Sequence, residues 1–328
     1  MDKQGFGKML QAFHWEEKVI KAATALAEKL EEFAKGKEPT AETAWAFSRQ
    51  LIKERKNSIR NYIALVLYCQ FIRNNDMYVA FLELVDGGEV SKNLYAKVGK
   101  KFGEEVRDEV FSGTGIAPYG TPTPDKPAYI HPVIKRLEKK VGEKACIEFL
   151  SAGLRNLPER DYLEGRGKYR QAGDIDTYLR QKKEGFLAQL EDFRREGRMF
   201  FAQEITAEVI KLVRNNPEMG AGRREGNIIY ETKIPYMAKQ YLAETDPTLK
   251  RYYACHCPWA RDAIKNGDVK IARNLCYCSG GFMKKSWEVI FKQPLKVEVL
   301  ESVLSGGELC RFAIHLPKEA LAGKKQKK

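Results

Sequence analysis

The fold class is indicated by residues 295–316, LKVEVLESVLSGGELCRFAIHL. Two runs rich in apolar residues, 295–304 and 308–316, flank Ser305-Gly306-Gly307. Glycine readily adopts the positive φ that a tight hairpin needs, so this stretch predicts two antiparallel strands. Residues 227–234, rich in Ile, Tyr and Thr, predict a further strand. The C-terminal third of the chain is therefore expected to combine helices with an antiparallel sheet.

Upstream of Pro217, apolar residues recur every three or four positions, which is typical of packed helices. The clearest stripe predicts one helix over 90–110 and consists of Val90, Leu94, Val98, Phe102, Val106 and Val110. The fold class expected for the whole chain is thus α+β. A large N-terminal helical part precedes a C-terminal α+β domain with an antiparallel sheet.

Proline and glycine divide the helical part. The prolines Pro118, Pro122, Pro124, Pro127 and Pro132 all fall within 112–132, where they oppose a regular element. We expect this segment to be an ordered crossing loop between two helical regions. The expected division is a helical region 1–111, a crossing loop 112–132, a helical region 133–217, an α+β ligand- and metal-binding domain 218–317, and a basic tail 318–328.

Two Cys-x-Cys pairs carry the candidate chemistry: Cys255 and Cys257 within Cys-His-Cys-Pro-Trp, then Cys276 and Cys278. In extended backbone, residues i and i+2 point the same way, so each pair could offer two thiolates to one ion. Four thiolates suit zinc, and the same set could hold an iron–sulfur cluster. Reactive thiols and plain buried cysteines are the alternatives.

The neighbours of the cysteines suggest a ligand. In the extended geometry His256 and Tyr277 face away from the ion, which makes His256 a candidate general base and Tyr277 a candidate ligand contact. Pro258 and Gly280-Gly281 predict that both pairs lie just before helices, whose positive ends would favour an anion. Arg261 and Arg273 could add charge, so we expect a small carboxylate ligand.

The remaining sequence features restrict the class of protein. The net charge of +13 comes from basic residues spread among 44 acidic ones, so it mainly indicates solubility, and nucleic acid ranks last among the expected partners. No apolar run approaches the roughly 20 residues that span a bilayer, and no secretory signal is evident, so a cytoplasmic protein is expected. Cys310 alternates with Phe312 and Ile314, which predicts a core position for its side chain.

The C-terminal third resembles two related groups, the L-2-amino-thiazoline-4-carboxylic acid hydrolase-like proteins and the 4-vinyl-reductase small-molecule-binding domains. The matching positions are Cys276 or Cys278, Phe282, Gly306, Cys310 and Phe312. The whole chain is also similar to an uncharacterised bacterial and archaeal family in which Cys-His-Cys-Pro-Trp recurs. The resemblance implies an α+β pocket domain that binds a small carboxylated or hydrophobic ligand, with cysteines that hold a metal.

Three functions are thus expected, in this order. The first is a small-molecule-binding protein with a zinc site on Cys255, Cys257, Cys276 and Cys278. The second is a hydrolase of a small cyclic amidine or amide that uses a metal-bound water or a cysteine, with His256 as the base. The third is a zinc-stapled nucleic-acid-binding protein, and its local hint is Tyr252 and Tyr253 beside Arg251.

Overall fold

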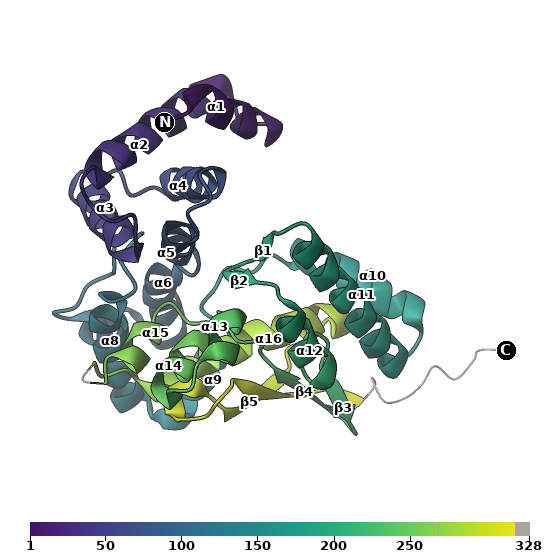
Figure 1. Cartoon of the computed structure of the whole chain (residues 1–328). Coiled ribbons are helices and arrows are strands. Elements are labelled where there is room, and N and C mark those ends of the chain that lie inside the picture. Colours follow the sequence, from purple (N-terminus) through teal and green to yellow (C-terminus); the bar gives the residue numbers. More distant parts are fainter. Residues whose placement is uncertain (268, 319–328) are drawn as a thin grey trace.

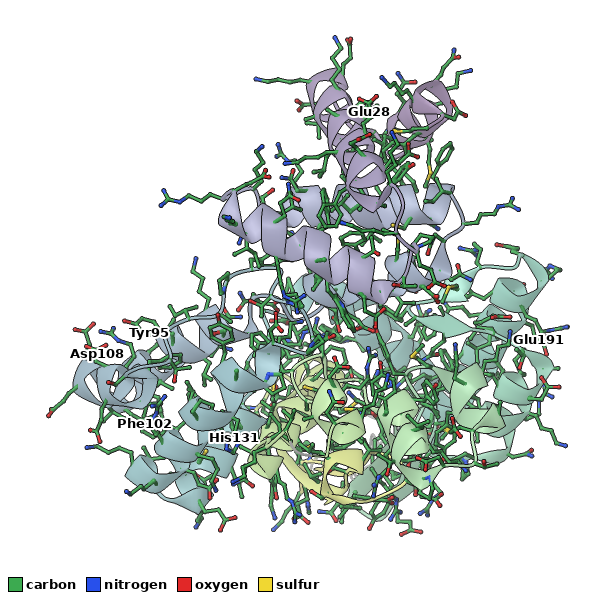
Figure 2. The ribbon with its side chains drawn as sticks, turned by 60° about the vertical axis from the view of Figure 1, so that its left-hand side comes forward. Glu28, Tyr95, Phe102, Asp108, His131 and Glu191 are labelled. Atoms are coloured by element: carbon green, nitrogen blue, oxygen red, sulfur yellow. The ribbon has the colours of Figure 1, made fainter. Side chains whose placement is uncertain are left out.

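The computed structural model describes residues 1–267 and 269–318 and shows a curved helical arm rising from an α+β body (Figure 1). Most of the expected basic tail, residues 319–328, lies outside the described residues. Within the described ranges, no helix is both long enough and apolar enough to cross a bilayer. In Figure 2, Glu28 marks the arm, Tyr95, Phe102 and Asp108 mark one edge of the body, and Glu191 marks the opposite edge.

The predicted hairpin and strand form one antiparallel sheet in the order β3-β4-β6-β5. The strands are β3 (Arg223–Glu225), β4 (Ile228–Thr232), β5 (Lys296–Glu301) and β6 (Arg311–His315). In the register, Ile314 lies beside both Ile229 and Val297, so apolar residues of three strands share one face. These residues pack with Trp287 in one core, which confirms the α+β class.

The turn between β5 and β6 depends on its glycines. Gly306 has φ +99°, a conformation that residues with a Cβ rarely adopt. A Cβ at Gly307 would lie 2.3 Å from Cγ of Glu301, so a larger residue would clash with the preceding strand. The connection also contains the short 3-10 helix η3 (Val303–Ser305), and it is therefore longer than a two-residue hairpin turn.

The arm is built from five helices with a core of their own. They are α1 (Lys3–Ala12), α2 (Glu17–Ala34), α3 (Ala41–Lys53), α4 (Ile59–Phe71) and α5 (Asn75–Val85). Phe6, Phe47 and Phe81 are fully buried in this core, which confirms that the helices of the first region are amphipathic packing helices.

Four helices follow at the foot of the arm: α6 (Val90–Phe102), α7 (Glu104–Phe111), α8 (Lys126–Val141) and α9 (Glu143–Ser151). The prediction of one helix over 90–110 is wrong because Gly103, at φ +97°, breaks it into α6 and α7. The crossing loop is shorter than predicted because α8 begins at Lys126 and includes both Pro127 and, in its interior, Pro132. Pro127 fits its first turn, where proline removes no intrahelical hydrogen bond.

The core of α6–α9 also includes residues from the C-terminal third, namely Trp259, Ala272 and Leu275. The indole Nε1 of Trp259 donates a hydrogen bond to the carbonyl oxygen of Gly87 at 2.9 Å. The body of the molecule is therefore assembled from segments far apart in the sequence.

The remaining elements surround the sheet. The helices are α10 (Leu163–Ala172), α11 (Ile175–Arg195), α12 (Ala207–Asn215), α13 (Ala238–Ala243), α14 (Pro247–Ala254), α15 (Arg261–Lys265) and α16 (Cys276–Phe291), with 3-10 turns η1 (Glu159–Tyr162) and η2 (Arg273–Leu275). A small hairpin of β1 (Met199–Phe200) and β2 (Gln203–Glu204) connects α11 to α12.

Helix α16 lies directly against the sheet because it begins with small residues. A Cβ at Gly280 would lie 3.2 Å from a methyl of Val297 on β5. A Cβ at Gly281 would lie 2.7 Å from the backbone nitrogen of Gly153. These close approaches bring the first turn of α16 into the centre of the body.

Candidate functional site

A cavity of about 440 Å³ lies where the foot of the arm, the β1–β2 hairpin, the sheet and α16 meet. Helix α16 contributes Ser279, Phe282, Met283 and Ser286, which follow the i, i+3, i+4, i+7 spacing of one helix face. Strand β4 and the residues after it contribute Glu231, Thr232, Lys233 and Ile234. The wall thus combines side chains from one face of α16 and from β4 with side chains from the loops that follow β4 and α14.

Five cysteines line this cavity. Cys255 caps the C-terminal end of α14, and Cys257 follows in the loop before α15. Cys276 and Cys278 lie in the first turn of α16, and Cys310 directly precedes β6. The structure therefore brings together the four predicted cysteines and adds a fifth. Cys310 does share a face with Phe312, but it lies at the edge of the core where the cavity begins.

The prediction that both pairs lie just before helices holds only for the first pair. Cys276 and Cys278 belong to α16 itself, so their side chains leave the helix about 200° apart. Across residues 1–267 and 269–318, no three His, Cys, Asp or Glu side chains are grouped as metal ligands. The four thiols, as they are arranged, do not form the tetrahedral site expected for zinc, and the metal stays a prediction of the sequence.

The cavity thiols lie in apolar surroundings that disfavour the thiolate. Burial raises the pKa of Cys257 to about 11 and that of Cys276 to about 12. Burial likewise raises the pKa of Cys255, Cys278 and Cys310, which in Cys278 is partly offset by a backbone hydrogen bond at Leu154 and by Arg155. At neutral pH these cysteines are therefore weak nucleophiles in the absence of a bound group.

His256 also lines the cavity and is uncharged at neutral pH. Its Nε2 donates to the carbonyl oxygen of Ile234, which leaves Nδ1 as the acceptor of the neutral ring. Burial, with a smaller contribution from Lys233, lowers the pKa of His256 to about 3. Its ring meets that of Tyr236 edge to face at 5.2 Å. A pKa this low makes the neutral ring a weak base at neutral pH, which does not favour the predicted role of His256 as a general base.

The charged side chains of the wall are paired, with one exception. Arg155 binds Asp86, Lys182 lies 3.6 Å from Glu231, and Arg311 holds Glu218 through two hydrogen bonds of 2.7 Å. Lys233 has no carboxylate within ion-pair distance in the described part of the chain. Its Nζ donates to Ser279 Oγ at 2.7 Å and lies 5.4 Å from the ring of Phe282. One positive charge of the wall is therefore left without a counter-charge.

The three residues predicted to bind ligand do not line the cavity. Arg261 is 3% exposed, forms an ion pair with the buried Glu83, and lies over the rings of Tyr236 and Tyr252. Arg273 is exposed at η2, and Tyr277 packs against the core of α6–α9. Proximity to the cysteines in sequence did not determine where these side chains point.

The apolar part of the wall includes Phe282, one of the positions of the resemblance, and two aromatic residues of the β1–β2 hairpin that no pattern in the sequence indicated. Phe200 and Phe201 extend from the β1–β2 hairpin, and Phe201 is 64% exposed. The ring of Phe282 lies near two cations, because the guanidinium of Arg155 is 5.5 Å and the ammonium of Lys233 is 5.4 Å from its centre. The wall thus offers aromatic surface next to positive charge.

Comparison of the chain with protein-family models, with curated proteins and with solved structures found no match. The resemblance of the C-terminal third to small-molecule-binding and hydrolase-like groups therefore stays a prediction from the sequence.

Proposed function

We propose that this protein binds a small carboxylate with an apolar body in the five-cysteine cavity. The observation that supports this proposal is the charge of the wall, where Lys233 is the cation left over after the three ion pairs are counted. A charged group in a largely apolar site is stabilised by an opposite charge. A monoanion would supply that charge, and its body would contact Phe200, Phe282 and Met283.

The size of the cavity is consistent with such a ligand. Volumes of about 300–1,000 Å³, mostly apolar walls and a few placed polar groups are typical of small-molecule sites. Lys233 and Ser279 are joined by a hydrogen bond, so the ammonium group is held in one position. A carboxylate bound to the ammonium of Lys233 would therefore also lie close to the hydroxyl of Ser279.

A matched pair of compounds tests the charge requirement. We expect 3-phenylpropionate to raise the melting temperature by about 5 °C at about 100 times its Kd, because a ligand that binds only the folded state stabilises it. The neutral 3-phenylpropionamide has nearly the same shape and should shift it far less. Differential scanning fluorimetry at moderate salt makes the comparison. Equal shifts with the acid and the amide, or no shift with either, would contradict the proposal.

Short oligonucleotides are tested in the same assay, because nucleic acid is the alternative class of anionic ligand. If the basic charge only attracts phosphates non-specifically, their binding should be weak and should fall steeply as salt rises. Tight, salt-resistant oligonucleotide binding, without any response to the acid, would favour the nucleic-acid function instead.

Hydrolysis of a small amidine or amide is the second candidate, because His256 and five thiols line the same cavity. Because burial holds the thiols in the protonated form, a nucleophilic cysteine would need a bound ion or ligand that favours the thiolate. The binding function therefore ranks first.

The thiolate metal site has its own test. If Cys255, Cys257, Cys276 and Cys278 rearrange around zinc or an iron–sulfur cluster, replacing both Cys255 and Cys276 by Ser should remove the metal and lower the melting temperature. Elemental analysis and the absorption spectrum of the purified protein measure the metal. Unchanged metal content and unchanged melting in the double variant would leave the cysteines as lining of the cavity.

A further inference from the structure

The side chain of Gln203 is a buried polar group of the cavity wall whose acceptor is unused. Gln203 lies on β2, is 2% exposed and lines the cavity. Its Nε2 donates to the carbonyl oxygen of Pro235 at 3.0 Å. Since a carbonyl only accepts hydrogen bonds, this contact fixes which end of the amide faces Pro235. No group in the described part of the chain donates to the other end, Oε1.

The rest of the wall makes this acceptor distinctive. Among the residues that line the cavity, the other buried side-chain atom without a partner is Nε of Arg155, which is a donor and lies 3.9 Å from the carboxylate of Glu89. The acceptors Glu218, Glu231 and Ser279 all receive hydrogen bonds from protein groups. An unpaired buried acceptor destabilises the folded protein, and a donor on a ligand would remove that cost.

Gln203 and Lys233 are linked through the same short segment. Pro235, which accepts from Gln203, is two residues beyond Lys233. The cation without a counter-charge and the unpaired acceptor therefore come from the segment that follows β4 and from the hairpin hydrogen-bonded to it.

We propose that the ligand carries an O–H or N–H donor in addition to its carboxylate, and that Gln203 Oε1 accepts a hydrogen bond from it. This inference rests on the proposed function and narrows its ligand class to apolar carboxylates with a hydroxyl, amino or amide group. Oε1 has almost no accessible surface, so the proposed hydrogen bond requires a small movement of the β1–β2 hairpin or of the Gln203 side chain. The hairpin has only two residue pairs, and Phe201 at its turn is largely exposed.

The test uses 3-phenylpropionate, its three ring-hydroxylated isomers and the three corresponding methyl ethers, titrated calorimetrically. With the unaltered protein, at least one hydroxyl isomer should bind about fivefold more tightly than its methyl ether, as expected for one net hydrogen bond. In Gln203→Met, which keeps the length of the side chain but has no oxygen acceptor, that preference should disappear. Gln181→Met, at an exposed position of α11, is the matched control and should keep it.

The possible results distinguish a failure of this inference from a failure of the proposed carboxylate-binding function. Binding of all the acids without a preference for hydroxyl, or a preference retained in Gln203→Met, overturns the role of Gln203 and leaves the carboxylate site standing. No binding of any acid overturns both. If Gln203→Met fails to fold, the series on the unaltered protein still overturns the inference when no hydroxyl isomer binds more tightly than its methyl ether.

Discussion

Replacing Arg261 by Met is expected to lower the free energy of unfolding by about 3 kcal/mol. Arg261 and Glu83 are both almost completely buried and form an ion pair between α15 and α5. Burial raises the pKa of Glu83, and Arg261 counteracts that effect. Without the guanidinium, the carboxylate would be buried without its partner, which costs more than the pair contributes. Urea unfolding, followed by circular dichroism, measures the change.

Two further variants show whether the ion pair is the cause. The double variant Glu83→Gln with Arg261→Met should be more stable than Arg261→Met alone, because it no longer buries an unpaired charge. Arg273→Met changes an exposed arginine and should alter stability by less than about 0.5 kcal/mol. A stability of Arg261→Met equal to that of Arg273→Met would show that the buried pair has little effect.

Replacing Lys233 by Met is expected to weaken binding of 3-phenylpropionate about 30-fold, the effect of losing a charged hydrogen-bond donor. The ammonium is the unpaired cation of the cavity, and Met preserves most of the side-chain volume. The affinity for the neutral 3-phenylpropionamide should change little, because an uncharged compound is not attracted by the ammonium of Lys233. Isothermal titration calorimetry with both compounds measures the two affinities.

Two further variants separate the effect of the charge of residue 233 from the effect of its position in the cavity. Lys233→Arg keeps the charge and should retain most of the affinity for the acid. Lys211→Met, on the exposed side of α12, is the matched control and should bind like the unaltered protein. If Lys233→Met weakens the acid and the amide equally, the loss reflects a damaged cavity and the proposed anion contact is wrong.

The sheet was predictable because its signal is local. Runs rich in apolar residues flank Ser305-Gly306-Gly307, and together with the positive φ of Gly306 they specify the hairpin within one short stretch. Helix boundaries were predicted less well. The stripe from Val90 to Val110 continues through Gly103, and apolar periodicity alone does not report the break that this glycine introduces.

The candidate site was predictable only in part. The clustering of the two Cys-x-Cys pairs in sequence indicated the place, but the direction of Arg261 depends on Glu83 in the distant α5, which no local pattern reveals. A signal for Lys233 was present. Ile229, Glu231 and Lys233 lie on one face of the β4 segment, so two charged residues share a face with a core residue. Charged side chains on an inward face usually have a functional or pairing role.

The hydrogen bond between Trp259 and Gly87 spans 172 positions of the chain, and it has a consequence for folding during synthesis. The buried apolar core of the arm comes from residues 6–84, so it can begin to pack early in synthesis. The cavity needs both the foot of the arm and β6, so its wall is complete only after nearly the whole chain has emerged. Such distant contacts are slow to form. Until then, the aromatic residues of the future wall are open to solvent, and nascent chains paused at this stage should be the form most dependent on chaperones.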